Sequence, residues 1–125
     1  MLDDNAGAYD AARRDYERAL ELARQLGDPS AEAIELCNLG LFLCAHDELS
    51  RGYQMIQDAL AISERLGDIY AAGKAIEFLG RADTYRGDIP AAIAHFREAL
   101  RRFEQVQSPD AEIVRAALRR LGAES

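Results

Sequence analysis

The sequence predicts an all-α protein in which about six helices form a stack of antiparallel pairs. The chain resembles itself at an interval of forty residues, which is typical of helical-repeat proteins. Apolar residues recur at the three- and four-residue spacing of amphipathic helices, and no stretch alternates as a strand does. The length of 125 residues fits a single domain, 1–125.

The repeat appears when the chain is written in blocks of forty residues. The matching positions are Ala-Leu at 19–20, 59–60 and 99–100, Leu-Gly-Asp at 26–28 and 66–68, and Leu-Gly at 39–40 and 79–80. A repeat unit that cannot bury its apolar face alone does so by stacking on its neighbours. The self-similarity therefore predicts a stack of similar units.

The first expected helix covers 9–26, where Tyr16 and Leu20 belong to an apolar stripe between charged residues. Gly27 is expected as a left-handed cap, and Asp28-Pro29 as a turn into the next helix. The same reasoning predicts the remaining helices at about 30–46, 48–66, 69–86, 89–106 and 110–121.

Charge and composition argue against some classes of function. The net charge of −7 argues against general coating of nucleic acid, which depends on Lys and Arg. The charge is uneven, because residues 1–68 carry a balance of −8 and residues 69–125 a balance of +1. No secretory signal opens the chain, so we expect a cytoplasmic protein.

Two stretches of the chain carry a more specific pattern of small and large residues. The first contains Leu36, Leu39, Gly40 and Leu43, then Gly52, Ile56 and Ala59; the second contains Ile76, Leu79, Gly80 and Asp83, then Ala92, Phe96 and Ala99. This spacing resembles the tetratricopeptide repeat, with W-x2-L-G-x2-Y in its first helix and A-x3-F-x2-A in its second. Gly or Ala lets two helices approach closely, and one large residue fills the adjoining space.

The resemblance implies a right-handed stack of helix pairs, a tetratricopeptide-like α-solenoid. Its units would be 8–27 (a second helix only), 29–67, 69–107 and a capping helix at 109–122. Asp83 departs from the pattern, since an aromatic residue is usual there, and the period of forty exceeds the usual length of about 34. The longer units are similar to those of kinesin light chains and bacterial regulators, and the period also suits HEAT repeats.

The run 36–45 has no charge and holds both cysteines. On a helix, Cys37 and Cys44 lie about 10 Å apart, too far for a disulfide or a shared zinc ion. Cys44 and His46 point to different faces, and ten uncharged residues cannot span a membrane, which needs about 20. We therefore expect buried free thiols in a groove wall, with no metal, no cofactor and no membrane segment.

In the tetratricopeptide family the first helices of successive units line a concave groove that binds peptides. The residues so placed are Ile34, Cys37, Asn38, Leu41 and Cys44; Lys74, Glu77, Phe78, Arg81 and Tyr85; and Val114, Ala117 and Leu121. Such a mixture of apolar and polar groups suits a peptide. The alternative is that Phe78 and Leu41 are core residues and that the charged ones form a solvated ladder. A chaperone-type carboxylate clamp is incomplete, because Phe78 replaces a basic residue.

The resulting hypothesis is a non-catalytic protein-interaction module, the scaffold or sensor part of a bacterial regulator. Since the match begins in the second helix of a unit, we expect the chain to belong to a longer array. Enzyme motifs such as G-x-S-x-G, H-E-x-x-H and the Walker A loop do not occur. His95 is expected to pack half-exposed, and His46 to sit favourably at a helix end.

Two other functions stay open. One is a self-assembling or spacer segment, in which an uncovered face of the first helix, formed by Tyr9, Tyr16 and Ala19, makes a homodimer. The other is contact with nucleic acid, for which aromatic residues between the basic ones are missing. Its candidate residues are Arg97, Arg101, Arg102, Arg115, Arg119 and Arg120.

Overall fold

The computed structural model of the chain describes residues 4–123, with side chains from Gly7 onward. These residues form six helices and no strand, which confirms the predicted all-α class. The helices are α1 (Asp4–Gln25), α2 (Pro29–Ala45), α3 (Leu49–Leu66), α4 (Ile69–Arg86), α5 (Ile89–Gln105) and α6 (Asp110–Arg120). None of these described helices combines the length and the hydrophobicity needed to cross a membrane.

The helix bounds lie close to the predicted ones everywhere except at the start of the chain. The apolar pattern predicted a first helix from residue 9, whereas α1 begins at Asp4. Alanine is the best helix former, so Ala6 and Ala8 allow the helix to extend beyond its apolar stripe. Periodicity detects only the part of a helix that packs against something.

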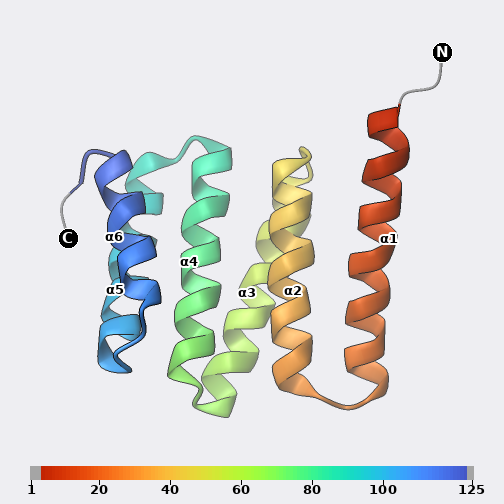
Figure 1. Cartoon of the computed structure of the whole chain (residues 1–125), viewed down its shortest axis with the longest axis horizontal. Helices are drawn as coiled ribbons and strands as arrows, with labels where there is room; N and C mark the ends of the chain where they lie inside the picture. The colour runs from red at the N-terminus through yellow and green to blue at the C-terminus, as the bar shows by residue number, and fades with distance from the viewer. Residues whose placement is uncertain (1–3, 124–125) are drawn as a thin grey trace.

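The helices follow one another side by side, with the two ends of the chain at opposite ends of the row (Figure 1). Each helix packs against the next one in the chain, and α2 also packs against α4. The contacts are most extensive within two pairs, α2 with α3 and α4 with α5. The arrangement is therefore a helical-repeat-like row in which α2 and α4 are neighbours across a pair boundary.

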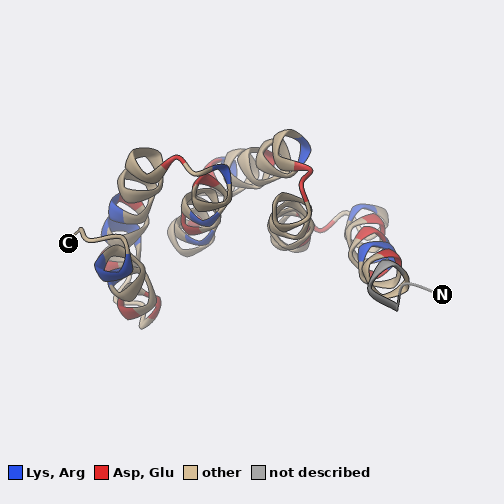
Figure 2. Ribbon diagram, turned by 90° about the horizontal axis from the view of Figure 1, so that it is seen from above, with Lys and Arg blue, Asp and Glu red and all other residues tan. Residues whose placement is uncertain are grey.

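Short acidic connections join several of these helices, and the red segments between helices in Figure 2 mark them. The carboxylates of Asp28, Asp68 and Asp88 accept hydrogen bonds from the backbone N–H groups of Ala31, Ala71 and Ala91 at 3.1, 2.9 and 3.1 Å. Each capping aspartate satisfies a donor at the start of the following helix. Gly27 has a φ of +64°, which confirms the predicted left-handed cap.

The buried apolar residues form two clusters. The first lies mainly between α1, α2, α3 and α4 and includes Leu39, Leu43 and Ile56, each at most 1% exposed. The second lies mainly between α4, α5 and α6 and includes Phe103 and Leu118, both fully buried. Helix α4 contributes to both clusters, since Leu79 belongs to the first and Ile76 to the second. The residues between α2 and α4 that pack inward belong to the first cluster.

Candidate functional site

A pocket of about 310 Å³ opens between α2 and α4, beside the turn that joins α3 to α4. We call it the α2–α4 pocket. Its lining residues are Ser30, Ala33, Ile34, Cys37, Asn38, Ser63, Leu66, Asp68, Tyr70, Ala71, Lys74 and Phe78. Most of these are apolar, and a mainly apolar concavity with a few polar groups is the usual form of a binding site.

The α2–α4 pocket has a buried floor and an exposed apolar rim. Cys37 is 7% exposed, and burial raises the pKa of its thiol to about 12. Around it, Ile34, Leu66 and Tyr70 are 59%, 47% and 44% exposed. The rim therefore offers large apolar side chains to a ligand, while the neutral thiol adds no charge to the floor.

Two further pockets continue this surface. A central pocket of about 290 Å³ is lined by Tyr16, Asn38, Leu41, Phe42, Ala45, Phe78, Arg81 and Tyr85. An α4–α6 pocket of about 280 Å³ is lined by Arg81, Thr84, Tyr85, Phe96, Ala117, Arg120 and Leu121. Asn38 and Phe78 border the first two pockets, and Arg81 and Tyr85 border the last two. The three pockets therefore form one continuous strip, here called the α2–α4–α6 surface.

Phe78 lies at the centre of this strip. The ammonium of Lys74 is 5.6 Å from the centre of its ring, and the guanidinium of Arg81 is 5.0 Å from it. At such distances a cation is attracted to the ring face. Phe78 is half-buried and borders two pockets, so it belongs partly to the core and partly to the surface.

The structure places most of the predicted groove residues on this surface. Ile34, Cys37, Asn38, Lys74 and Phe78 line the α2–α4 pocket. Leu41, Arg81 and Tyr85 line the central pocket, and Ala117 and Leu121 line the α4–α6 pocket. The prediction missed Leu66 and Tyr70. Leu66 ends α3, a second helix that the prediction did not consider, whereas Tyr70 lies in the first turn of α4, before the first groove position that the pattern assigned there, Lys74.

Three predicted groove residues lie elsewhere. Cys44 is 3% exposed and its sulfur is 3.8 Å from the carbonyl oxygen of Leu49, so the prediction is wrong for this residue. Val114 is fully buried in the second core cluster and is also not a groove residue. Glu77 is 4% exposed, lines none of these pockets, and lies 3.4 Å from the ammonium of Lys74. Lys74 and Glu77 thus pair at the i, i+3 spacing of the alternative charge ladder, but Glu77 is buried and does not lie on a solvated face.

The predicted self-association face of α1 is already covered within the chain. The ring of Tyr9 stacks on Phe42 of α2 at 5.1 Å, and its hydroxyl donates a hydrogen bond to Glu48 at 2.8 Å. The ring of Tyr16 lies 5.2 Å from that of Phe42, and Ala19 is half-buried. The expectation of an uncovered face is therefore wrong, because α2 supplies its partner.

The C-terminal arginines do not form a purely basic patch. Arg102 pairs with Glu64 at 2.8 Å, and Arg115 pairs with Glu104 at 2.6 Å. Arg101 also pairs with a glutamate, Glu98. Pairing with carboxylates reduces the positive field that a nucleic acid would meet. Two of the six predicted nucleic-acid contacts line pockets: Arg102 lines a small one beside Glu64, and Arg120 lines the α4–α6 pocket.

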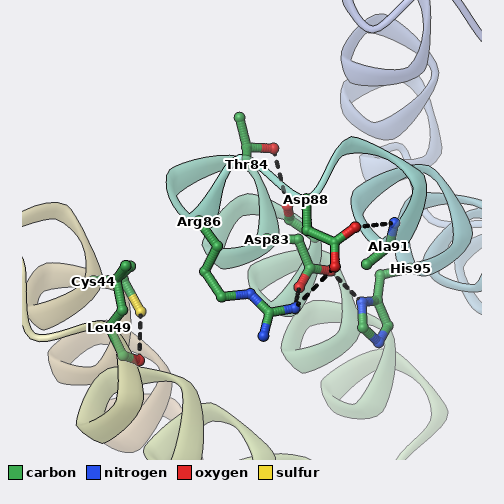
Figure 3. A network of polar contacts seen from close by, with 9 residues as sticks. Cys44, Leu49, Asp83, Thr84, Arg86, Asp88, Ala91 and His95 are labelled. Atoms are coloured by element: carbon green, nitrogen blue, oxygen red, sulfur yellow. Dashed lines mark hydrogen bonds and ion pairs between the residues drawn. The ribbon is translucent and has the colours of Figure 1, made fainter.

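A polar cluster that the sequence did not reveal lies around Asp83, which is fully buried (Figure 3). Arg86 donates a hydrogen bond to its carboxylate at 2.7 Å, and Nδ1 of His95 lies 2.5 Å from it. On α3, burial and the neighbouring Asp83 carboxylate raise the pKa of Tyr53 to about 12. The cluster thus connects α4 with α3 and α5, so His95 is a hydrogen-bonding partner of Asp83 and not only a packing residue.

This cluster does not belong to the α2–α4–α6 surface, since neither Asp83 nor His95 lines its pockets. Within the described part of the chain, no group of His, Cys, Asp and Glu side chains is arranged to hold a metal ion. Both cysteines are free and buried, as predicted from the uncharged run. The candidate site is therefore the strip of three pockets, which can hold a ligand by apolar contact and positive charge.

Comparison with known proteins adds no relative. No protein-family model matches the chain, and no curated protein matches it in sequence. The resemblance to tetratricopeptide repeats stays a prediction that rests on the residue pattern itself.

Proposed function

We propose that the chain is a protein-interaction module that binds an extended segment of a partner protein on the α2–α4–α6 surface. The observation that carries this proposal is the α2–α4 pocket, with its apolar rim over a buried floor. A peptide-binding groove selects the side chains of its ligand through apolar pockets that carry a few polar groups.

Exposed apolar side chains gather on this surface. The described residues include nine large apolar side chains that are exposed, and four of them line the strip: Ile34, Leu66, Tyr70 and Tyr85. Single exposed apolar residues are normal on a protein, whereas a contiguous group marks an interaction site. This gathering supports a binding function for the strip.

The proposal includes a tetratricopeptide-like right-handed stack with the strip on its concave side. The forty-residue period and the glycines at the helix crossings support it. The role of a scaffold or sensor part in a cytoplasmic bacterial regulator is proposed on the same resemblance. No catalytic step is assigned, because the buried Asp83 is paired with His95 and Arg86 away from the strip.

A peptide selection tests this function. The full chain is used to select binders from a displayed library of random peptides, and the affinity of a selected peptide is then measured for two variants. Ile34→Asp places a charge on the rim of the α2–α4 pocket, whereas Ile113→Asp does so at an equally exposed site on α6 (59% and 53% exposed). A charge in an apolar contact is costly, so we expect Ile34→Asp to weaken binding by about tenfold or more.

The control variant Ile113→Asp is expected to bind as the wild type does, and both variants should keep its thermal stability. Equal affinity of the wild type and Ile34→Asp would contradict the proposal, as would a library that yields no binder.

A further inference from the structure

The α4–α6 pocket differs from the rest of the strip because two guanidinium groups border it. Arg81 comes from the last third of α4 and Arg120 from the end of α6. Both are exposed, and the aromatic side chains of Tyr85 and Phe96 line the space of about 280 Å³ beside them. The pocket thus combines two fixed positive charges with apolar walls.

Neither guanidinium is neutralised by the described part of the protein. Arg86, Arg102 and Arg115 all pair with carboxylates. In contrast, Arg81 and Arg120 form no ion pair with a carboxylate of residues 7–123, and the contact of Arg81 is with the ring of Phe78. Other arginines among the described residues also lack a carboxylate partner, but the α4–α6 pocket is lined by two of them and by no Asp or Glu. A pocket lined by Arg14 and Arg18, in contrast, also contains Asp15 and Glu17.

An anionic ligand group complements these two positive charges. A guanidinium binds a carboxylate through charge-assisted hydrogen bonds, which are about twice as strong as neutral ones. Because Arg81 and Tyr85 also border the central pocket, a ligand in the α4–α6 pocket can continue toward the apolar end of the strip. A chain-like ligand with an acidic group at one end and apolar groups at the other fits this arrangement.

The length of the ligand follows from α4, which borders all three pockets. Ala71 lines the first pocket and Tyr85 the last, and these residues are separated by 14 positions, or about 21 Å along a helix. An extended peptide rises about 3.3 Å per residue, so about six or seven residues cover this distance.

We propose that the α4–α6 pocket is a carboxylate subsite, in which Arg81 and Arg120 bind an Asp or Glu side chain of the partner peptide about six residues from its apolar anchor. This inference rests on the proposed function, because it assumes that a peptide occupies the strip. It adds the chemistry of the partner, which is an acidic segment with an apolar end.

The test compares two double variants with the same loss of charge. Arg81→Gln/Arg120→Gln removes the subsite, whereas Arg65→Gln/Arg119→Gln removes two exposed arginines that line none of the three pockets. The probes are a peptide selected from the random library by the wild-type chain and the same peptide with its Asp or Glu changed to the amide.

We expect the selected peptides to be enriched in Asp or Glu at the predicted spacing. The subsite variant should bind the acidic peptide about tenfold more weakly than the wild type does, and the control variant should bind it normally. For the amide peptide, the wild type and the subsite variant should have the same reduced affinity.

Three outcomes overturn the subsite: no enrichment of acidic residues, equal weakening by both double variants, or a subsite variant that binds the acidic peptide normally. If Ile34→Asp still abolishes binding in those cases, the proposed function survives and only the subsite fails. If Ile34→Asp also has no effect, both fail. A single-stranded oligonucleotide that displaces the peptide and requires Arg81 and Arg120 would also overturn it, because the pocket would then bind phosphate.

Discussion

The α2–α3 pair and the α4–α5 pair achieve the same close helix crossing with different residues. In the first pair two glycines face each other, and a Cβ on Gly40 would lie 2.7 Å from the carbonyl oxygen of Gly52. In the second pair aromatic rings occupy that space, and a Cβ on Gly80 would lie 2.8 Å from the ring of Phe96. The first crossing is backbone against backbone, and the second is ring against backbone.

The two crossings differ in the residue on the second helix and agree in the residue on the first. Both crossings keep glycine on the first helix of the pair, while the second helix supplies either another glycine or a phenylalanine. The outer faces vary in the same way, since α2 contributes Ile34 and Leu41 to the strip and α4 contributes Lys74 and Arg81. The same architecture therefore carries exposed apolar side chains on one first helix and basic side chains on the other.

The largest expected effect on the free energy of unfolding comes from removing an aromatic ring that packs between α4 and α5. Phe103 is fully buried, and its ring lies over Gly73. We expect Phe103→Ala to lower the free energy of unfolding by about 3–5 kcal/mol, because the vacated volume cannot be refilled. Urea unfolding followed by circular dichroism measures this. The exposed Ile113→Ala serves as the control and should change stability by less than about 0.5 kcal/mol.

Adding a methyl group at each crossing distinguishes the glycine–glycine crossing of the first pair from the glycine–phenylalanine crossing of the second. Gly40→Ala should lower the free energy of unfolding by about 2 kcal/mol, because its Cβ meets backbone that cannot move alone. Gly80→Ala should cost less than about 1 kcal/mol, because the Phe96 ring can shift and alanine favours the helix. Adding Phe96→Leu to Gly80→Ala should recover part of that loss. Equal costs at Gly40 and Gly80 in urea unfolding would show that the crossings do not differ.

The buried carboxylate of Asp83 joins the two pairs. Asp83→Asn keeps the shape but weakens the hydrogen bonds with Arg86 and His95, so we expect a loss of about 1–2 kcal/mol. The matched control is Asp68→Asn, since Asp68 caps α4 without pairing with Arg86, and asparagine caps a helix as well as aspartate does. Thermal or urea unfolding in which Asp68→Asn costs as much as Asp83→Asn would argue against the cluster as a connection between the pairs.

The smallest expected effect is a loss of stability at high pH. Tyr53 and Tyr70 each have a pKa raised from 10.0 to about 12, Tyr53 mainly by burial and Tyr70 mainly by its hydrogen bond to Asp110. The folded state therefore favours the neutral phenols. Their contribution to stability is complete below pH 10 and is lost as the pH rises from about 10 to 12.

Phenolate absorbance measures this ionisation in the folded chain. Two tyrosines should ionise near pH 12, and Tyr53→Phe and Tyr70→Phe should each remove one of them. Ionisation of both near pH 10 in a chain that is still folded would show that neither tyrosine is held neutral.

The sequence predicted the helices and the glycines of the crossings well, because helical periodicity and the forty-residue repeat can be recognised directly in the order of the residues. It also predicted most of the α2 and α4 side chains on the strip. It did not predict the Asp83 cluster, because Tyr53 and His95 reach Asp83 from different helices, and only the packing brings them together. The position of Tyr9 against Phe42 was missed for the same reason.

The central claim is that the α2–α4–α6 surface binds a peptide, and an NMR titration tests it most directly. The isotope-labelled chain is titrated with a library-selected peptide, and the shifts of the backbone amides are followed. The account predicts saturable shifts concentrated around Ile34, Phe78 and Arg81, with little change at Ile113. Shifts confined to parts of α3 and α5 that line none of the three pockets would contradict it.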